Sequence, residues 1–342
     1  MYRLSIAGVF GLYAEGGPLI ERVLRLLAAG MLAVFATGHA AAQQAYPARQ
    51  VRVIVPFPPG GSNDVVARLV SQKLTEIWGQ QVLIDNRPGG NTIIGSEALI
   101  KSPPDGYTLM LTSSAHVITP LLIPTPYDAL KDFGPVATLA ISENILVIHP
   151  SLPAYNLRQF IALAKARPGQ TNYASSGAGS PSHLATASFE LLAGIRMQHV
   201  PYKGGGPAII DLIGGHVQLH FNTPITLAPH IKTGKLRALA ITGGSRFPAL
   251  PQLPTFSEAG LPAFDLKTWF GVFVPVATPR EVIDKLSADI AKMLALPDFR
   301  QTLDGLGMAP LVSTPDKFAA LMKSDTTILA KVIKAGNIKL EQ

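Results

Sequence analysis

The fold is decided by residues 51–64, which read VRVIVPFPPGGSND. Residues 51–57 are apolar and rich in β-branched side chains, a pattern that predicts a buried strand. Apolar side chains then recur at helical spacing from Val66 to Ile77, and Gly79 suits the left-handed residue that ends a helix. A strand, a glycine-rich loop and a helix in this order are the opening unit of an α/β fold.

The chain repeats this unit further along. Short buried strands are expected at residues 82–84 and 109–112, each bounded by turn residues. A strand at 172–174, a Gly/Ser loop at 175–182 and a helix that Gly194 ends form a second unit. The alternation of strands and helices favours a parallel sheet, and two such units predict two α/β lobes.

Two apolar passages, residues 136–149 and 264–275, could carry the chain between the lobes. The last part of the chain has the pattern of two helices, and we expect both to pack on the first lobe. The first opens with a capping box at residues 278–281, with Pro279 as its first helical residue, and the second opens at Thr314-Pro315.

The predicted organisation has three parts. A leader occupies residues 1–42, the first lobe residues 43–143 and 268–342, and the second lobe residues 144–267. A cleft between the lobes is then the default ligand site.

Residues 1–42 have the pattern of a secretory signal peptide. Arg22 and Arg25 precede an apolar stretch at 26–37, and Ala40–Ala42 form a small-residue cleavage signal. The stretch is shorter than the roughly 20 apolar residues of a membrane-spanning helix, which disfavours a retained anchor. We expect cleavage and export to the periplasm. The residues ahead of the arginines lengthen the leader, so a later translation start stays open.

The composition excludes several classes of protein. The chain has 342 residues, of which 47% are hydrophobic and 15% charged, and this is typical of a globular rather than a disordered or coiled-coil chain. It contains no cysteine, so thiol nucleophiles, thiolate metal sites and disulfides are excluded. The 29 basic residues behind the net charge of +7 are scattered, without the basic runs typical of nucleic-acid binding.

The glycine loop at residues 57–64 is the strongest candidate site. Glycines let backbone N–H groups approach a ligand closely, and the N-terminus of the following helix carries partial positive charge. The loop therefore suits an anion. The alternative is that Ser62, Asn63 or Asp64 only caps the helix.

Three further segments offer polar groups to the same cleft. The loop at 175–183 has the same glycine and hydroxyl character, although His183 could instead be a buried structural histidine. Lys203 either lends a positive charge to the cleft or is solvated. Asn222 and Thr223 either line the cleft or form an ordinary turn.

Motifs of common enzyme classes are absent from the sequence, including those of serine hydrolases, zinc proteases, P-loop enzymes and dinucleotide-binding proteins. Ser180 and His183 could be drawn as a nucleophile and its base, which leaves an exported serine hydrolase as an alternative. No orienting carboxylate accompanies them. We therefore expect a protein with no catalytic residue, no metal and no cofactor.

Ordered landmarks along the chain resemble a known family. They lie at residues 46–47, 55–61, 64, 67–68, 86–89, 104–109, 126–128, 132–133, 175–177, 183–184, 199–204, 254–255, 258–260 and 269–271. Over about residues 46–336 the sequence resembles the periplasmic solute-binding receptors of tripartite tricarboxylate transporters, the Bug-type receptors.

The resemblance implies an α/β fold of two lobes, a type II-like Venus flytrap that closes on a small organic carboxylate. It implies that the loops at 57–64 and 175–183 grip one carboxylate through backbone N–H groups and ordered water. The expected partner of this monomer is a membrane permease of the tripartite type; a receptor for a signalling partner is the alternative. The candidate ligand-binding residues are Phe57, Gly60, Gly61, Ser62, Asn63, Asp64, Ser113, Ser114, Ser175, Ser176, Gly177, Gly179, Ser180, His183, Tyr202, Lys203 and Asn222.

The sequence departs from the family pattern in two places. Residues 90–95, GNTIIG, lack the extra glycine and the asparagine expected before the final glycine. Asn222 stands where an acidic residue is common. Both departures affect the expected pocket, so the resemblance does not identify the ligand.

Overall fold

The computed structural model describes residues 46–262, 264–335 and 338. The chain divides into residues 1–48 and a compact unit from Arg49 onward, and every helix and strand of the described residues lies in the second unit. The predicted signal peptide at 1–42 lies outside the described residues. Among the described residues, no helix combines the length and the apolar character needed to cross a membrane.

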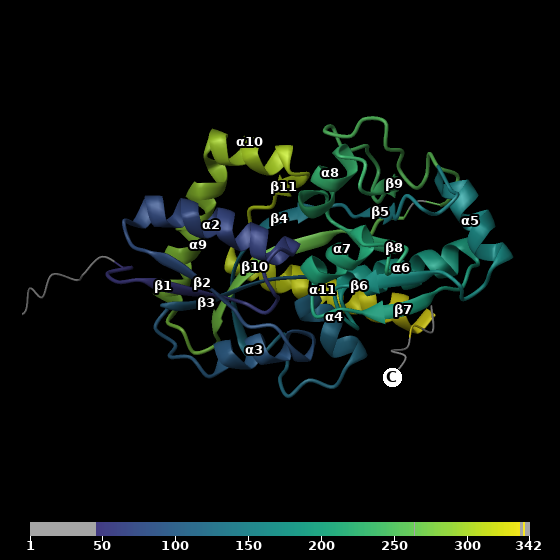
Figure 1. The fold of residues 1–342 in the computed structure, drawn as a ribbon. Helices are drawn as coiled ribbons and strands as arrows, with labels where there is room; N and C mark the ends of the chain where they lie inside the picture. The colour runs from purple at the N-terminus through teal and green to yellow at the C-terminus, as the bar shows by residue number, and fades with distance from the viewer. Residues whose placement is uncertain (1–45, 263, 336–337, 339–342) are drawn as a thin grey trace, which may run out of the picture. The chain divides into compact units, whose positions relative to one another are not determined.

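The first sheet has six strands in the order β11-β4-β10-β3-β1-β2 (Figure 1). Its strands are β1 (Val51–Val55), β2 (Val82–Asn86), β3 (Thr108–Ser113), β4 (Phe133–Ser142), β10 (Thr268–Pro275) and β11 (Met308–Pro310). β1 pairs in parallel with β2 and β3, whereas β10 runs antiparallel to β3 and β4.

The second sheet has five strands in the order β7-β6-β8-β5-β9. Its strands are β5 (Ile145–Ile148), β6 (Asn172–Ser175), β7 (Gln198–Pro201), β8 (Leu219–Asn222) and β9 (Arg237–Ile241). β6 is parallel to β7 and β8, and β5 is antiparallel to β8 and β9.

Both sheets are therefore mixed, and the prediction of a parallel sheet is right only for strands joined by helical crossovers. The antiparallel strands β5 and β10 are those that enter from the other sheet. β4 ends at Ser142 and β5 begins at Ile145, so no crossover helix fits between them. A pattern of alternating strands and helices carries no information about such a direct passage.

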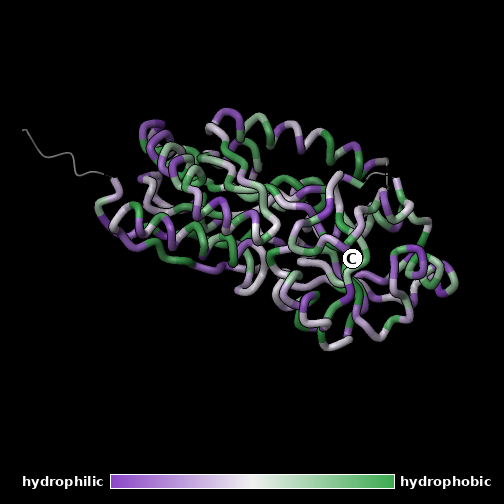
Figure 2. The backbone as a smooth tube through the Cα atoms, turned by 90° about the horizontal axis from the view of Figure 1, so that it is seen from above, coloured by the Kyte–Doolittle hydropathy of each residue, from purple (hydrophilic) through white to green (hydrophobic). Residues whose placement is uncertain are grey.

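The helices are α2 (Ser62–Trp78), the short η2 (Gly90–Thr92), α3 (Ile93–Ile100), α4 (Ala115–Leu122), α5 (Leu157–Ala166), α6 (Pro181–Ala193), α7 (Gly205–Ile213), α8 (Pro224–Lys232), α9 (Arg280–Ala295), α10 (Pro297–Gly305) and α11 (Pro315–Ala335). Gly79 ends α2 and Gly194 ends α6 in left-handed conformations with φ of 64° and 61°, which confirms both predicted helix ends. In Figure 2 the helical turns alternate between hydrophilic and hydrophobic residues, as expected for helices that bury one face.

The C-terminal helices differ from the prediction in two respects. Helix α9 begins at Arg280 after Pro279 as N-cap, without a side-chain cap, so the predicted capping box is wrong. The extended backbone of Pro279 takes the cap position itself, and the buried Thr278 hydroxyl has no hydrogen-bond partner in the described part of the chain. Helix α10 was not expected from the sequence, because it buries only Phe299 and Leu303.

Two of the C-terminal helices pack on the first sheet. Helices α9 and α11 both contact β4. Phe318 of α11 packs edge-on against Trp269 of β10, with ring centroids 5.2 Å apart. Aromatic and aliphatic side chains of the first sheet, α4 and α11 form one core, and a separate core lies against the second sheet.

The chain passes between the sheets twice, from β4 to β5 and from β9 to β10. Asn144 joins the two passages. Its backbone N–H donates to Thr242 Oγ1 at 2.8 Å, and its side-chain amide donates to the carbonyl of Leu266 at 2.8 Å. The two segments that connect the lobes are therefore bonded to each other next to the site described below.

Candidate ligand site

A small cavity lies where strands of both sheets end and helices begin. Its volume is about 30 Å³, which exceeds the roughly 10–15 Å³ that one water needs. The lining residues are Phe57, Gly61, Ser62, Asn63, Ser113, Asn144, Ser176, Pro181, Ser182, Gly205, Asn222, Thr223, Thr268 and Phe270. This position, at the carboxyl ends of β1, β3, β6 and β8, is the usual ligand position of an open α/β sheet.

The first loop leaves the N-terminus of α2 open to the cavity. The N-cap is Gly61, and no side chain caps the helix. The N–H groups of Ser62 and Asn63 have no acceptor among the described residues. These are the orphan donors of a helix N-terminus, and they carry its partial positive charge. The alternative that Ser62, Asn63 or Asp64 caps the helix is therefore not what the structure shows.

Asp64 instead fixes the conformation of the first loop through hydrogen bonds to its carboxylate. Its carboxylate accepts the Gly60 N–H at 3.0 Å, the Asn86 amide at 3.0 Å and the Arg68 guanidinium at 2.9 Å. Burial acts to raise the pKa of Asp64, but the hydrogen bonds from Arg68, Gly60 and Asn86 outweigh it and the pKa is lowered. The carboxylate stays ionised and fixes the glycine turn, so its charge is already paired.

The second loop uses its N–H groups internally. Ser176 N donates to Ser182 Oγ at 2.8 Å, Gly177 N to Ser175 Oγ at 3.2 Å, and Gly179 N to His183 Nδ1 at 3.2 Å. This differs from the expectation that both loops offer backbone N–H groups to the ligand. The second loop instead contributes Ser176 and the start of α6 to the cavity lining. The Ser182 N–H at this helix start has no acceptor among the described residues.

Two stacked histidines support the second loop. The rings of His183 and His199 lie 4.2 Å apart at 7°, and Tyr173 stacks on the other face of His199 at 4.9 Å. His199 Nε2 bonds to Ser175 Oγ at 2.7 Å. Burial lowers the pKa of His183 to about 4, and burial with the nearby His183 lowers that of His199 to about 3. Both rings are therefore neutral near pH 7, and His183 acts as a support for the loop rather than as part of the cavity lining.

Ser180 and His183 are not arranged as a nucleophile and its base. Ser180 Oγ accepts the backbone N–H of His183 at 3.3 Å, which is a helix cap, and bonds to Ser182 Oγ at 3.0 Å. The acceptor nitrogen of the His183 ring is occupied by the Gly179 N–H. The observation that motivated the hydrolase alternative is thus explained by capping of α6.

Glycines let the two lobes meet beside the cavity. A Cβ built on Gly206 would lie 2.6 Å from the Pro59 carbonyl oxygen, and one on Gly204 would lie 2.5 Å from Pro58 Cδ. A Cβ on Gly61 would lie 3.4 Å from the nitrogen of Gly206. The first loop therefore packs directly on the backbone at the start of α7, and side chains at Gly204 and Gly206 would prevent the approach.

Side chains also bridge the lobes at the cavity. Ser62 Oγ donates to Asn222 Oδ1 at 2.9 Å and lies 2.7 Å from Thr223 Oγ1, which must then be the donor of that bond. Asn222 is held in turn by His220, whose Nε2 lies 3.3 Å from its amide nitrogen and whose Nδ1 donates to the Ala174 carbonyl. Burial lowers the pKa of His220 to about 4, which keeps it neutral.

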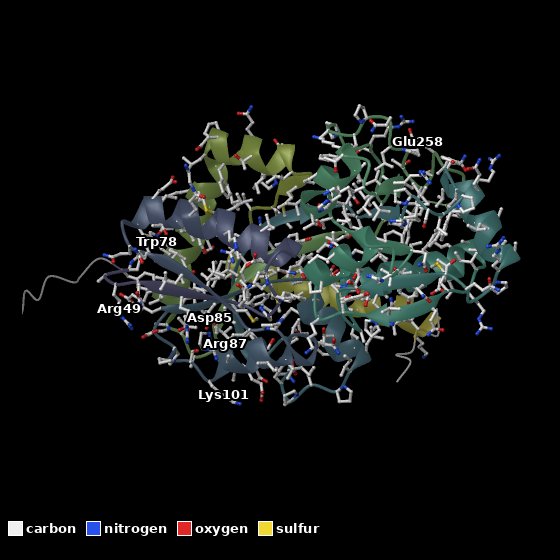
Figure 3. The ribbon with its side chains drawn as sticks, in the orientation of Figure 1. Arg49, Trp78, Asp85, Arg87, Lys101 and Glu258 are labelled. Atoms are coloured by element: carbon white, nitrogen blue, oxygen red, sulfur yellow. The ribbon has the colours of Figure 1, made fainter. Side chains whose placement is uncertain are left out.

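Among the residues that the structure describes, no charged side chain lines the cavity. In Figure 3 the labelled ionic side chains of Arg49, Asp85, Arg87 and Lys101 project from the half of the unit that holds β1–β3, and Glu258 lies on the other half. None of these lines the cavity. The positive potential of the site therefore comes from helix N-termini rather than from side chains, which suits an anion without pairing it to a buried cation.

The structure brings together part of the predicted set. Phe57, Gly61, Ser62, Asn63, Ser113, Ser176 and Asn222 line the cavity. Tyr202 and Lys203 line a second cavity beside it, which Phe57 and Ser176 also line. The others do not line the first cavity. Gly60, Asp64, Ser175, Gly177, Gly179, Ser180 and His183 make hydrogen bonds within the two loops, and Ser114 lies at the start of α4.

The candidate list omitted seven lining residues. Asn144, Thr268 and Phe270 reach the cavity from the passages between the sheets, and the other four lie at the starts of α6, α7 and α8: Pro181, Ser182, Gly205 and Thr223. Asn144 is 4% exposed, and its Oδ1 accepts from Thr268 at 3.4 Å. One signal was available for Asn144, because the polar pair Glu143-Asn144 interrupts two apolar strands. Among the residues that the structure describes, no cluster of three or more His, Asp or Glu side chains could hold a metal ion.

Two α/β sheets, a chain that passes twice between them and a polar cavity bounded by both define a solute-binding protein of two lobes. The sequence profile described as tripartite tricarboxylate transporter family receptor matches residues 66–338. The chain belongs to this receptor family.

Three similar proteins illustrate the relationship. Protein BugT of Bordetella pertussis (strain Tohama I) is 37% identical over 322 residues, which cover 93% of this chain and 99% of BugT. The structure of R. palustris Rpa4515 with adipate is 34% identical, with a TM-score of 0.84 over 86% of this chain and 99% of that one. The structure of MatC (Rpa3494) from Rhodopseudomonas palustris with bound malate is 31% identical, with a TM-score of 0.79 over 84% and 100%.

Proposed function

We propose that this receptor captures a small organic carboxylate in the periplasm and delivers it to the membrane permease of a tripartite transporter. The carboxylate binds in the cavity between the lobes, at the N-terminus of α2. The observation that carries the proposal is a polar cavity that, within the described part of the chain, has no charged lining residue and is lined by Ser62 and Asn63, whose N–H groups have no acceptor there. The adipate and malate held by two similar structures support the same class of ligand.

The energetics are sufficient for useful affinity. Hydrogen bonds to a charged group contribute roughly 1.5–3 kcal/mol each, and a helix N-terminus adds about 0.3–1 kcal/mol. The available donors on the described residues are the N–H groups of Ser62, Asn63 and Ser182 and the hydroxyl groups of Ser113 and Ser176. Three or four such bonds offset the ordering cost and reach the roughly −8 kcal/mol of a micromolar complex.

Localisation and delivery rest on the sequence pattern and the family. The signal-peptide pattern at 1–42 supports export, and the family description supports a tripartite permease as the partner. Deletion of the gene should abolish uptake of the bound acid, and expression of the protein should restore it. Normal uptake in the deletion strain would contradict the delivery role.

Binding is tested by thermal unfolding of the purified protein with a panel of mono- and dicarboxylates. A ligand at a hundredfold excess over its dissociation constant stabilises the folded protein by about 2.7 kcal/mol, which raises the unfolding midpoint by a few degrees. The corresponding primary amides are the control, because they keep the shape and lose the charge. The proposal fails if no acid on the panel shifts the midpoint, or if amides shift it equally.

A further inference from the structure

The two passages between the sheets border a cavity on each side. Asn144 and Thr268 line the ligand cavity, whereas their chain neighbours Glu143 and Lys267 line another cavity of about 460 Å³, which we call the hinge cavity. Side chains of successive residues along a strand point to opposite faces, and the passages continue this alternation. A side chain in the hinge cavity is therefore only one residue away from a side chain in the ligand cavity.

Glu143 connects the two passages from the side of the hinge cavity. Its Oε1 lies 3.4 Å from Lys267 Nζ, and its Oε2 accepts the Thr242 hydroxyl at 3.0 Å. A Cβ built on Gly243 would overlap the Glu143 carboxyl group, so the carboxylate packs directly on the backbone that follows Thr242. The φ of 84° at Gly243 favours glycine as well. Lys267, Thr242 and this bare backbone together fix the position of the carboxylate.

Thr242 links this carboxylate to the wall of the ligand cavity. Its hydroxyl oxygen accepts the Asn144 N–H at 2.8 Å. The single hydroxyl proton of Thr242 can then be donated to Glu143 at 3.0 Å or to the Leu266 carbonyl at 3.1 Å. Hydrogen bonds to an ionised acceptor are about twice as strong as those between neutral groups, so the carboxylate is the preferred acceptor. Thr242 is fully buried, which strengthens both of its bonds.

The surroundings of Glu143 affect how readily it is protonated. Burial raises the pKa of Glu143 above its ordinary value, and the hydrogen bond from Thr242 and the charge of Lys267 oppose this shift. Other charged groups line the hinge cavity or pair with Lys267: Arg246, Asp304 and Asp265. Protonation of Glu143 therefore begins at a higher pH than that of an exposed glutamate, and it removes the charge that Lys267 and Thr242 contact.

We propose that Glu143 is a positioning residue of the ligand site. Through Thr242 it holds the backbone of Asn144 where the two passages meet, and it thereby favours the arrangement of the lobes that binds the ligand. Glu143 itself lines the hinge cavity and not the ligand cavity, so its effect on affinity passes through Asn144. This proposal rests on the proposed function and adds to it a residue behind the site that controls affinity.

The first test needs no ligand. The Asn144 N–H should exchange slowly with deuterium in the wild-type protein, because it is bonded to Thr242 in a buried position. Glu143→Gln keeps the size of the side chain and removes its charge, so exchange of the Asn144 amide should become about tenfold faster at pH 7.5. The control is Glu97→Gln, which removes a carboxylate paired to a lysine on α3 outside both cavities and should leave this exchange unchanged.

The second test measures affinity by isothermal titration calorimetry. The probe is the acid that raises the unfolding midpoint most in a panel that includes adipate and malate. At pH 7.5 Glu143→Gln should bind it about tenfold more weakly than the wild type. Lys267→Met, at an exposed position, should weaken binding about threefold, whereas Lys267→Arg keeps the positive charge beside the carboxylate and should bind as the wild type does.

The pH dependence separates positioning by charge from a merely structural role. The ratio of the dissociation constants of Glu143→Gln and the wild type cancels the titration of the acid itself. This ratio should fall as the pH is lowered from 7.5 to 5, because the protonated Glu143 of the wild type then resembles glutamine. A role in packing alone would leave the ratio the same at every pH.

The outcomes distinguish the two proposals. If Glu143→Gln changes neither exchange nor affinity, or if the ratio does not depend on pH, Glu143 is not a positioning residue while the carboxylate receptor stands. If no acid on the panel binds, both proposals are overturned, whatever the exchange result. Faster exchange and a ratio that falls with pH in Glu143→Gln, together with wild-type behaviour of Glu97→Gln, support the positioning role.

Discussion

The loop before α2 and the loop before α6 look alike in sequence and use their backbone N–H groups in opposite ways. In the first, Ser62 and Asn63 leave their N–H groups open to the cavity, and Asp64 fixes the turn from behind. In the second, Ser182, Ser175 and His183 accept the loop's own N–H groups. The first loop offers N–H donors to a ligand, whereas the second loop uses its N–H groups to fix its own conformation. Glycine and serine content alone does not distinguish the two, because both need the same residue types.

We expect the largest loss of ligand affinity from a substitution that keeps the first loop away from α7. Gly206→Ala places a methyl group 2.6 Å from the Pro59 carbonyl oxygen, so the lobes cannot close as they do here. Gly206 is the second residue of α7, where alanine is no worse a helix former than glycine. We therefore expect ligand affinity to fall at least a hundredfold, while the unfolding midpoint without ligand stays equal or rises.

The control is Gly305→Ala, since a Cβ at Gly305 meets nothing within 4 Å. Calorimetric titration and thermal unfolding measure the two effects. An affinity within threefold of wild type in Gly206→Ala would show that this contact is not part of the ligand-binding arrangement.

The second expected effect is a pH dependence of stability from the histidines behind the second loop. The pKa of His199 is lowered from 6.5 to about 3 in the folded protein, so the unfolded chain binds a proton that the folded protein does not. Stability is fully present above pH 6.5 and is lost as the pH falls through the window from 6.5 toward 3. Near pH 5.5 this one group changes the free energy of unfolding by about 1.4 kcal/mol per pH unit.

His199→Gln should flatten the stability profile between pH 5 and 6 by about that slope, measured by urea unfolding at several pH values. His216→Gln, at an exposed position, is the control and should leave the profile unchanged. An unchanged slope in His199→Gln would mean that His199 is protonated in the folded protein. The stacked pair would then not be neutral.

A smaller effect is expected for the hydroxyl that joins the first loop to the second lobe. Ser62→Ala removes the bonds to Asn222 and Thr223 and leaves both groups with one partner fewer. Hydrogen bonds of this kind contribute about 1 kcal/mol each, so affinity should fall roughly tenfold. Ser71→Ala on the same helix removes a buried hydroxyl that has no partner among the described residues, and this variant should bind the ligand as the wild type does. Equal affinities of the two variants would mean that the hydrogen bonds of the Ser62 hydroxyl do not contribute to ligand binding.

The smallest effect is expected for the cap of α6. Ser180→Ala removes the cap on the His183 N–H and should lower the free energy of unfolding by about 1 kcal/mol. Ser188→Ala removes a hydroxyl of the same helix that has no partner in the part of the chain that the structure describes, and it should lower the free energy of unfolding by less. Ester hydrolysis measured on both variants completes the test. Hydrolysis by the wild type that disappears only in Ser180→Ala would restore the hydrolase alternative.

Much of the fold could be predicted because it depends on local patterns. The strand at 51–55, the helix that Gly79 ends and the second unit ending at Gly194 follow from hydrophobic period and glycine conformation. The mixture of parallel and antiparallel strand pairs could not be predicted. The strands β5 and β10 arrive directly from the other sheet, and no crossover helix marks their direction. The α9 cap was misplaced by one residue because only the backbone of Pro279 decides where the helix begins.

For the site, the sequence determined that a glycine loop precedes α2 and that its composition suits an anion. Only the tertiary structure decided which N–H groups stay free, that His183 supports the second loop, and that Asn144, Thr268 and Phe270 reach the cavity. The physical reason is that residue type fixes which donors and acceptors exist, whereas their pairing depends on which distant segments the fold brings within hydrogen-bond range. The same holds for Gly206, whose need for a bare backbone arises from the Pro59 carbonyl of the other lobe.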